Sequence, residues 1–143
     1  MKIYLAGPLF TEAERAWLTA LKQQIEERGR SNGENTVVIW PWELFAPGEV
    51  ESLGCNASKE IFRRCRDALE ECDTVVALLD GPLVDDGTAW EIGYAYARKK
   101  RIIGIRTDIR RIGECDGACA NAMIEHACER VVKGVKELLQ ALI

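Results

Sequence analysis

The sequence contains only one histidine, His126, among its 143 residues. Enzymes that activate a serine or cysteine nucleophile generally need a histidine base that the fold holds beside it. The single histidine therefore excludes most Ser-His and Cys-His arrangements. Because aspartate and glutamate account for 23 residues, we expect any acid–base chemistry of this protein to depend on carboxylates.

The sequence also lacks an excess of positive charge and a long apolar run. A formal net charge of -4 at pH 7 and a pI of about 5.2 argue against the basic face that binds a nucleic acid backbone. No apolar run approaches the roughly 20 residues of a membrane-spanning helix, and the apolar part of the Met1–Pro8 start is too short for a secretory signal. We expect a cytoplasmic protein with neither nucleic acid nor membrane as a partner.

Six cysteines are present, but their pattern favours neither a disulfide framework nor a metal site. The chain is long enough to bury a core without cross-links and shows no export signal, so we expect reduced thiols. Cys115 and Cys119 are separated by three residues, yet the chain has no second close cysteine pair and only one histidine to complete a zinc site. We therefore expect no metal, and the role of Cys115 and Cys119 stays open.

Short β-prone segments alternate with helical periodicity along the chain. The expected strands are Ile3–Gly7, Thr36–Trp40, Thr74–Leu79 and Arg101–Arg106. The expected helices are Glu12–Arg28 with Gly29 as its C-terminal cap, Ser58–Leu69, Thr88–Lys99, and one or two closing helices within Ala118–Leu142. This alternation predicts an α/β fold, a doubly wound parallel sheet of flavodoxin-like type with four to five strands and helices on both faces, in a single domain over residues 1–143.

Three loops follow expected strands and should share one edge of the sheet. They begin at Gly7-Pro8, Pro41-Trp42 and Asp80-Gly81. Ligands of such sheets bind at the carboxyl ends of the strands, near the point where the strand order reverses. The segment Pro41–Ala57 is expected to be a long loop whose apolar side chains cover something, as lids do, while Thr107–Gly117 is polar and without a clear periodicity.

Four carboxylates follow the third expected strand, namely Asp80, Asp85, Asp86 and Glu91. Asp85 and Glu91 are six residues apart, on either side of Gly87, which would let a ligand approach closely. Backbone amides at the start of a helix favour an ionised Glu91, while like charge can raise the pKa of a second carboxyl and keep it protonated. One carboxylate nucleophile beside one acid is what glycosyl transfer or hydrolysis requires. Asp80 and Asp86 are expected to be loop and capping residues.

An ordinary structural interpretation of the same segment stays open. Asp-Asp-Gly-Thr is also a common entry into a helix, in which Asp85 or Asp86 caps the helix and Glu91 is simply exposed. Asp67 can be a solvated charge among the arginines around it. Tyr4 can be a core residue. The residues alone therefore leave two roles open for this segment, a catalytic role and a capping role.

Taken together, these motifs resemble the nucleoside 2-deoxyribosyltransferase family. The resemblance rests on Ile3–Gly7 followed by Phe10, and on the pattern D-x-G-x-x-x-E-x-G-x-A from Asp85 to Ala95. It implies transfer of a 2-deoxyribosyl group between nucleobases through a covalent glycosyl-enzyme, with neither metal nor cofactor. Nucleosides and free nucleobases would be the partners.

The resemblance also implies a role for individual residues. Glu91 would be the nucleophile and Tyr4 would orient it. Asp85, with Asp67 beside it, would bind the base and protonate its ring nitrogen as it leaves. The substrate-binding residues would be Gly7, Phe10, Gly87, Asn121 and Met123. The last two resemble residues that a neighbouring subunit supplies, so a homo-oligomer, a dimer or a trimer of dimers, would share its active sites.

Two other functions remain open at this point. One is an N-glycoside hydrolase that acts on nucleosides or on deoxynucleoside 5'-monophosphates. The loop Gly7-Pro8-Leu9-Phe10 is followed by only one hydroxyl, that of Thr11, and contains no arginine, which favours an unphosphorylated nucleoside. The other is a non-catalytic nucleotide-binding module, because a fold does not fix a function. The preference for purines or pyrimidines and the tolerance of a 2-hydroxyl also stay open.

Overall fold

The computed structural model describes residues 1–110 and 113–142, and in this part of the chain five strands form one parallel sheet. The strands are β1 (Lys2–Ala6), β2 (Val37–Ile39), β3 (Thr74–Leu78), β4 (Arg101–Ile105) and β5 (Arg130–Val132). Their order is β2-β1-β3-β4-β5, with every neighbouring pair parallel. This is the order of flavodoxin-like sheets, which confirms the predicted α/β fold. The strand order reverses between β1 and β3.

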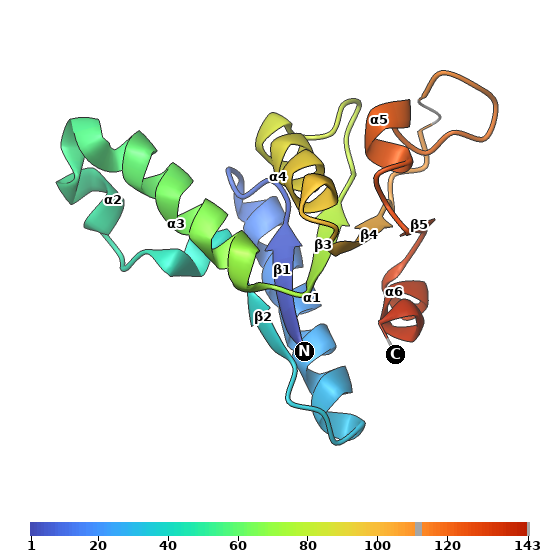
Figure 1. Cartoon of the computed structure of the whole chain (residues 1–143), viewed down its shortest axis with the longest axis horizontal. Helices are drawn as coiled ribbons and strands as arrows, with labels where there is room; N and C mark the ends of the chain where they lie inside the picture. The colour runs from blue at the N-terminus through green and yellow to red at the C-terminus, as the bar shows by residue number, and fades with distance from the viewer. Residues whose placement is uncertain (111–112, 143) are drawn as a thin grey trace.

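Helices cover both faces of the sheet (Figure 1). The helices are α1 (Glu12–Ser31), α2 (Glu49–Ser52), α3 (Ala57–Glu71), α4 (Asp86–Ala97), α5 (Ala122–Glu125) and α6 (Val135–Ala141), with short 3-10 turns η1 (Pro41–Leu44) and η2 (Gly54–Asn56). Helices α1 and α6 pack on one face, whereas α3, α4 and α5 pack on the other. In the part of the chain that the structure describes, none of the helices is both long enough and apolar enough to cross a membrane.

The side chains of β1 alternate between the two faces of the sheet, as strand geometry requires. Ile3 and Leu5 belong to the core beneath α1 and α6. Tyr4 and Ala6 belong to the core beneath α3 and α4. All four residues are completely buried. The alternation therefore directs the phenol of Tyr4 toward the helix that carries the predicted carboxylate motif.

Helix α1 continues through the glycine that was predicted to end it. Its N-terminus begins as predicted, because Thr11 and Glu14 form a capping box. At the other end Gly29 lies buried inside the helix, and Asn32 is the C-terminal cap. A Cβ at Gly29 would lie 2.3 Å from Oγ1 of Thr36. The predicted cap was therefore wrong, because Gly29 is needed for close packing against the residue that leads into β2.

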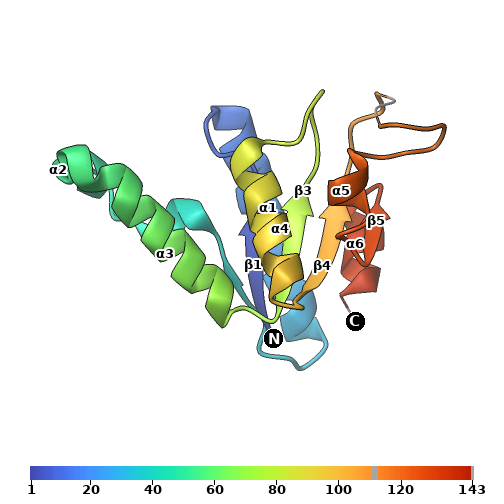
Figure 2. The same ribbon diagram turned by 45° about the horizontal axis from the view of Figure 1, so that its top comes forward.

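The segment Pro41–Ala57 was predicted to be a loop, but short helical turns occupy most of it. It contains η1, α2 and η2. Helix α2 and the first turns of α3 extend away from the sheet (Figure 2). The guanidinium of Arg64 fastens this segment to α3, because it donates to the carbonyl of Leu44 at 2.9 Å and to Oε1 of Glu49 at 2.5 Å.

One or two closing helices were predicted within Ala118–Leu142, and a short fifth strand was left possible; Arg130–Val132 is that strand and not part of a helix. These residues form β5, which pairs with β4 in the register Ile103 with Arg130 and Ile105 with Val132. Val131 packs toward α4 and Val132 toward α6, a period of two that the longer helical pattern around them concealed. Within Thr107–Gly117 the described residues form turns and bends, and Arg111 and Ile112 lie outside the described residues. Ile143, at the end of the predicted domain, also lies outside them.

Candidate active site

Tyr4 and Glu91 meet where β1 passes under α4. The hydroxyl of Tyr4 donates a hydrogen bond of 2.5 Å to Oε1 of Glu91, across 87 residues of sequence. Burial, and after it the charge of Glu91, raises the pKa of Tyr4 far above its usual value. The phenol therefore stays protonated and acts as a fixed donor to the carboxylate.

Glu91 is a partly buried carboxyl in the second turn of α4. Its pKa is raised to about 7, because burial raises the pKa most, while the hydrogen bond from Tyr4 lowers it and the charge of Asp85 raises it. Glu91 lies beyond the first turn of α4, so burial outweighs the helix amides that were predicted to keep this carboxyl ionised. At neutral pH, protonated and ionised Glu91 therefore coexist.

Asp85 is the N-cap of α4. Its Oδ2 accepts hydrogen bonds from the backbone N of Thr88 at 2.9 Å and from Oγ1 of Thr88 at 3.0 Å. The prediction that Asp86 caps the helix was wrong, since Asp86 is the exposed first residue of α4. A Cβ at Gly87 would lie 3.3 Å from the same Oδ2. Asp85 therefore caps α4 and also lies close enough to Glu91 for its charge to raise the pKa of Glu91.

Asp80 is a loop residue, as predicted, and it joins the ends of two neighbouring strands. Its Oδ1 accepts from the backbone N of Thr107 at 2.6 Å and from that of Asp108 at 2.9 Å. The carboxylate therefore ties the loop after β3 to the loop after β4. Its contacts are structural ones.

Asp67 makes its contacts on a different side of α3. Its carboxylate accepts hydrogen bonds from Arg63 at 3.1 Å and from Arg66 at 2.6 Å and 3.0 Å. Residues two apart on a helix point about 200° apart, and Cys65 is the residue of α3 that reaches the pair. Burial, and after it the charge of Glu91, raises the pKa of the Cys65 thiol. The base-binding role of Asp67 stays a prediction that its contacts do not favour.

Cys65 was not among the candidate residues that the sequence indicated. The signal was present, because Ile61, Cys65 and Leu69 repeat at intervals of four and mark the inward face of the helix. That pattern identifies a residue that packs inward. It does not say that Tyr4 and Glu91 will be the neighbours of the thiol.

A cavity of about 370 Å³ adjoins Cys65. It lies beyond the carboxyl ends of β1 and β2, where the doubly wound fold places ligands. Most of its wall comes from Pro41–Ala57, the segment whose apolar side chains were predicted to cover something. The lining residues are Leu9, Pro41, Trp42, Phe45, Ala46, Pro47, Gly48, Val50, Glu51, Ile61 and Cys65.

The remaining predicted site residues form no hydrogen bond with the side chain of Glu91 in the part of the chain that the structure describes. Gly7 is closely packed, because a Cβ there would lie 3.2 Å from side-chain atoms of Leu18 and of Leu78. Phe10 is 72% exposed.

Asn121 and Met123 begin α5, which packs beside α4. Oδ1 of Asn121 accepts from the backbone N of Met123 at 3.0 Å, and its Nδ2 donates to Glu114 at 2.7 Å. The Met123 side chain is 82% exposed. Both residues were predicted to act on the sugar bound in a neighbouring subunit, and that role would require an assembly of more than one subunit.

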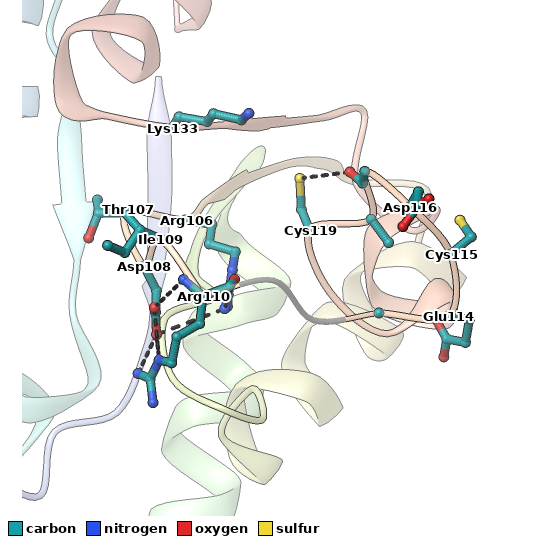
Figure 3. A pocket seen from close by; sticks show the side chains of 13 residues that line it. Arg106, Thr107, Asp108, Ile109, Arg110, Glu114, Cys115, Asp116, Cys119 and Lys133 are labelled. Atoms are coloured by element: carbon teal, nitrogen blue, oxygen red, sulfur yellow. Dashed lines mark hydrogen bonds and ion pairs between the residues drawn. The ribbon is translucent and has the colours of Figure 1, made fainter.

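A second, larger cavity of about 780 Å³ lies beyond β4 (Figure 3). Cys115 and Cys119 line it from one side, and the ion pair of Asp108 with Arg110 lines it from the other. Arg106 is buried behind them and donates to the carbonyls of Leu79 and Gly81. Within residues 1–110 and 113–142, no group of three or more His, Cys, Asp or Glu is placed so that it could hold a metal ion.

Comparison with known proteins gives a consistent result. The model of the nucleoside 2-deoxyribosyltransferase family matches residues 3–123. The uncharacterized protein UU063 of Ureaplasma parvum serovar 3 is 39% identical over 104 residues, which cover 71% of this chain and 63% of that protein, so the chain spans less than two thirds of its curated relative.

Two solved structures share the fold over nearly the whole chain. A conserved protein from Enterococcus faecalis V583 has 30% identity and a TM-score of 0.79, over 98% of this chain and 95% of that one. A 2-deoxyribosyltransferase from Bacillus psychrosaccharolyticus has 26% identity and a TM-score of 0.72, over 97% and 90%. The family match includes Tyr4, Asp85 and Glu91. The chain belongs to the nucleoside 2-deoxyribosyltransferase family.

Proposed function

We propose that this protein transfers a 2-deoxyribosyl group between nucleobases through a covalent glycosyl-enzyme on Glu91. The observation that carries the proposal is the 2.5 Å hydrogen bond from the buried Tyr4 to Oε1 of Glu91. A carboxylate held by a neutral donor at the ligand-binding edge of the sheet is suited to attack an anomeric carbon. Family membership supports the same reaction.

The first half of the reaction forms the glycosyl-enzyme. Tyr4 occupies Oε1, so Oε2 of ionised Glu91 attacks the anomeric carbon. The bond between that carbon and the base nitrogen breaks, and its electron pair goes to the base. The carboxyl of Asp85, when protonated, gives its proton to a ring nitrogen of the departing base, which lowers the basicity of the leaving group.

The second half reverses these steps with a different base. A nitrogen of the incoming base attacks the anomeric carbon, and the ester bond to Glu91 breaks with its electron pair returning to the carboxylate. Asp85 accepts the proton that the incoming base loses. Tyr4 stabilises the negative charge that reappears on Glu91, because its donor is already in place and requires no reorganisation.

We further propose that the active enzyme is a homo-oligomer in which Asn121 and Met123 act on the sugar bound in a neighbouring subunit. Exposed aromatic side chains beside the site support this. Trp90 stacks on Tyr94 with ring centroids 5.0 Å apart, and Phe62 of α3 contacts Trp90 edge-on with centroids 5.4 Å apart. Phe62 is 50% exposed and Trp90 45% exposed, and clustered exposed aromatics are typical of protein interfaces.

A base-exchange assay tests the proposed reaction. The protein is incubated with deoxyinosine and free adenine, and the nucleosides are separated by chromatography. Formation of deoxyadenosine supports the transferase. Release of hypoxanthine without a new nucleoside indicates the hydrolase instead, and no reaction with a panel of purine and pyrimidine deoxynucleosides indicates a binding module.

A variant links the reaction to its nucleophile. Glu91→Gln keeps the size of the side chain and an acceptor for Tyr4 but removes the nucleophilic carboxylate. We expect base exchange to fall by at least about a thousandfold, with an unchanged circular dichroism spectrum. Undiminished exchange by the folded variant contradicts the proposal.

A further inference from the structure

We propose that Glu114 is a positioning residue for the sugar: it holds the amide of Asn121 in the orientation that recognises a hydroxyl group, and its charge excludes substrates with a phosphate in that place. The inference rests on the proposed role of Asn121 at the sugar. It deepens that proposal by naming the substrate class, an unphosphorylated nucleoside. Glu114 itself forms no bond with the substrate in this scheme.

The carboxylate of Glu114 accepts two hydrogen bonds from the start of α5. Its Oε1 accepts from Nδ2 of Asn121 at 2.7 Å, and its Oε2 accepts from the backbone N of Ala122 at 2.9 Å. One oxygen thus binds the side chain of Asn121, while the other binds the backbone next to it. Because the carboxylate is held at two points, its position relative to the amide is fixed.

The orientation of the Asn121 amide follows from these contacts. An ionised carboxylate only accepts hydrogen bonds, so the end of the amide that faces Glu114 must be the NH₂ group. The Oδ1 end then accepts from the backbone N of Met123 at 3.0 Å. Without Glu114, nothing at the NH₂ end would oppose rotation of the amide, whose two ends are nearly equal in size.

The oriented amide keeps one donor and one acceptor for a ligand. An NH₂ group has two hydrogens and a carbonyl oxygen has two lone pairs, and the contacts with Glu114 and Met123 use one of each. The Asn121 side chain is exposed, so both remaining groups can be reached. A hydroxyl group donates and accepts and can use both of them, whereas the oxygens of an ionised phosphate only accept.

The charge beside Asn121 also disfavours a phosphate. A phosphate carries nearly two negative charges at neutral pH and is repelled by a carboxylate that bonds the same amide, which is a selective element against the wrong substrate. Cationic side chains that line the larger cavity lie on the side opposite Glu114 (Figure 3). They are Arg106, Arg110 and Lys133.

Two variants of Glu114 and one matched control test the inference in the base-exchange assay. Glu114→Gln keeps the size of the side chain and removes its charge, and Glu114→Ala removes both hydrogen bonds. The control is Glu125→Gln, because the Glu125 carboxylate also joins α5 to the preceding loop, at the backbone N of Cys119 (2.9 Å), without bonding the Asn121 side chain. Circular dichroism checks the fold of each variant.

The substrates are the deoxynucleoside that exchanges best in that assay, its 5'-monophosphate and its 3'-monophosphate. KM and kcat are measured for each, and a monophosphate that is not exchanged is measured as a competitive inhibitor. The preference for the nucleoside is the ratio of kcat/KM values, or of KM to the inhibition constant. Every measurement is repeated at low and high salt.

We expect Glu114→Gln to raise the KM for the nucleoside about threefold to tenfold and to change kcat by less than about twofold, because the lost contact contributes to binding of the sugar throughout the reaction. The preference over at least one monophosphate should fall roughly tenfold. In the parent protein this preference should weaken as salt screens the charge of Glu114. Glu114→Ala should raise the KM further, and Glu125→Gln should keep the parent values.

The outcomes separate this inference from the proposed function. If the parent protein exchanges no bases, or if Asn121→Ala exchanges them like the parent, the proposed function or the role of Asn121 fails, and the inference fails with it. If Asn121→Ala loses exchange while folded Glu114→Gln keeps the KM and the preference of the parent, only the role of Glu114 is wrong. A parent preference that does not change with salt contradicts the inference even where a variant does not fold.

Discussion

The hydroxyl of Tyr4 lies 2.5 Å from Oε1 of Glu91, although 87 residues separate the two in sequence. An interior strand of the sheet, β1, holds the phenol, and the second turn of α4 holds the carboxyl. Both partners therefore belong to regular elements and not to loops. This placement fixes the orientation of the carboxyl before any substrate arrives.

Ionisation of Glu91 should control the activity near neutral pH. Its pKa is raised to about 7, and only the ionised form attacks, so kcat/KM should increase as the pH rises toward 7. Tyr4→Phe removes the hydrogen bond that lowers this pKa, and the rising limb should move up by about one unit, with a roughly tenfold loss at pH 6.

The matched control for Tyr4→Phe is Tyr96→Phe, which alters an exposed tyrosine of α4, the helix that carries Glu91. It should keep the profile of the parent protein. A Tyr4→Phe profile that coincides with the parent profile would show that the hydrogen bond does not act on the nucleophile.

Asp85→Asn should separate capping from proton transfer. Asparagine is as good an N-cap as aspartate, so the bonds to Thr88 and the thermal stability should be retained. It cannot deliver a proton to the leaving base, and exchange should fall by roughly 100-fold or more. Thr88→Val is the reverse case, because it weakens the cap contact and leaves the acid in place. Loss of stability without loss of rate in Asp85→Asn would reduce Asp85 to a cap.

Glu91→Gln should stabilise the folded protein at alkaline pH. The folded-state pKa of Glu91, about 7, exceeds its ordinary value of 4.5. The folded protein therefore binds more protons than the unfolded chain between these values, and this group makes the protein less stable as pH rises from 4.5 to 7. Glutamine carries no such penalty. Calorimetry should give the variant a Tm a few degrees higher at pH 8 and no such advantage at pH 4; a lower Tm at both values would contradict the burial of this charge.

Mixing two inactive variants should restore activity if subunits share sites. Glu91→Gln lacks the nucleophile and Asn121→Ala lacks the residue assigned to the neighbouring subunit. After the two are unfolded together and refolded, half of the dimers are mixed and each has one intact site, so activity should return to about a quarter of the parent level. Light scattering gives the oligomeric state. Oligomers that form without regaining activity would place Asn121 in the site of its own subunit.

The local sequence pattern predicted most of the regular structure. It failed where contacts with distant parts of the chain determine the local structure. Four strands and the helices α1, α3 and α4 follow from period-two and period-3.6 patterns. The fifth strand was hidden, because Arg130–Val132 is short and becomes a strand only by pairing with β4. Gly29 was misread for a similar reason, since the neighbour that requires a glycine is Thr36, across the turn into β2.

The candidate site shows the same division. The spacing of Asp85 and Glu91 placed both at the start of one helix, and the resemblance singled out Tyr4. The packing of α4 against the sheet decides two properties of these residues. It determines which oxygen of Asp85 caps the helix, and it makes Glu91 partly buried. Neither property is a function of local sequence.

By itself, the sequence determined an α/β sheet whose strand ends carry carboxylates, because the periodicity and the turn residues that produce these features are local. Tertiary structure alone decided that Tyr4 contacts Glu91, that the carboxylate of Asp67 pairs with Arg63 and Arg66, and that the pKa of Glu91 is raised to about 7. The physical reason is that desolvation and hydrogen bonding depend on the distance between elements, which only packing of the helices on the sheet sets.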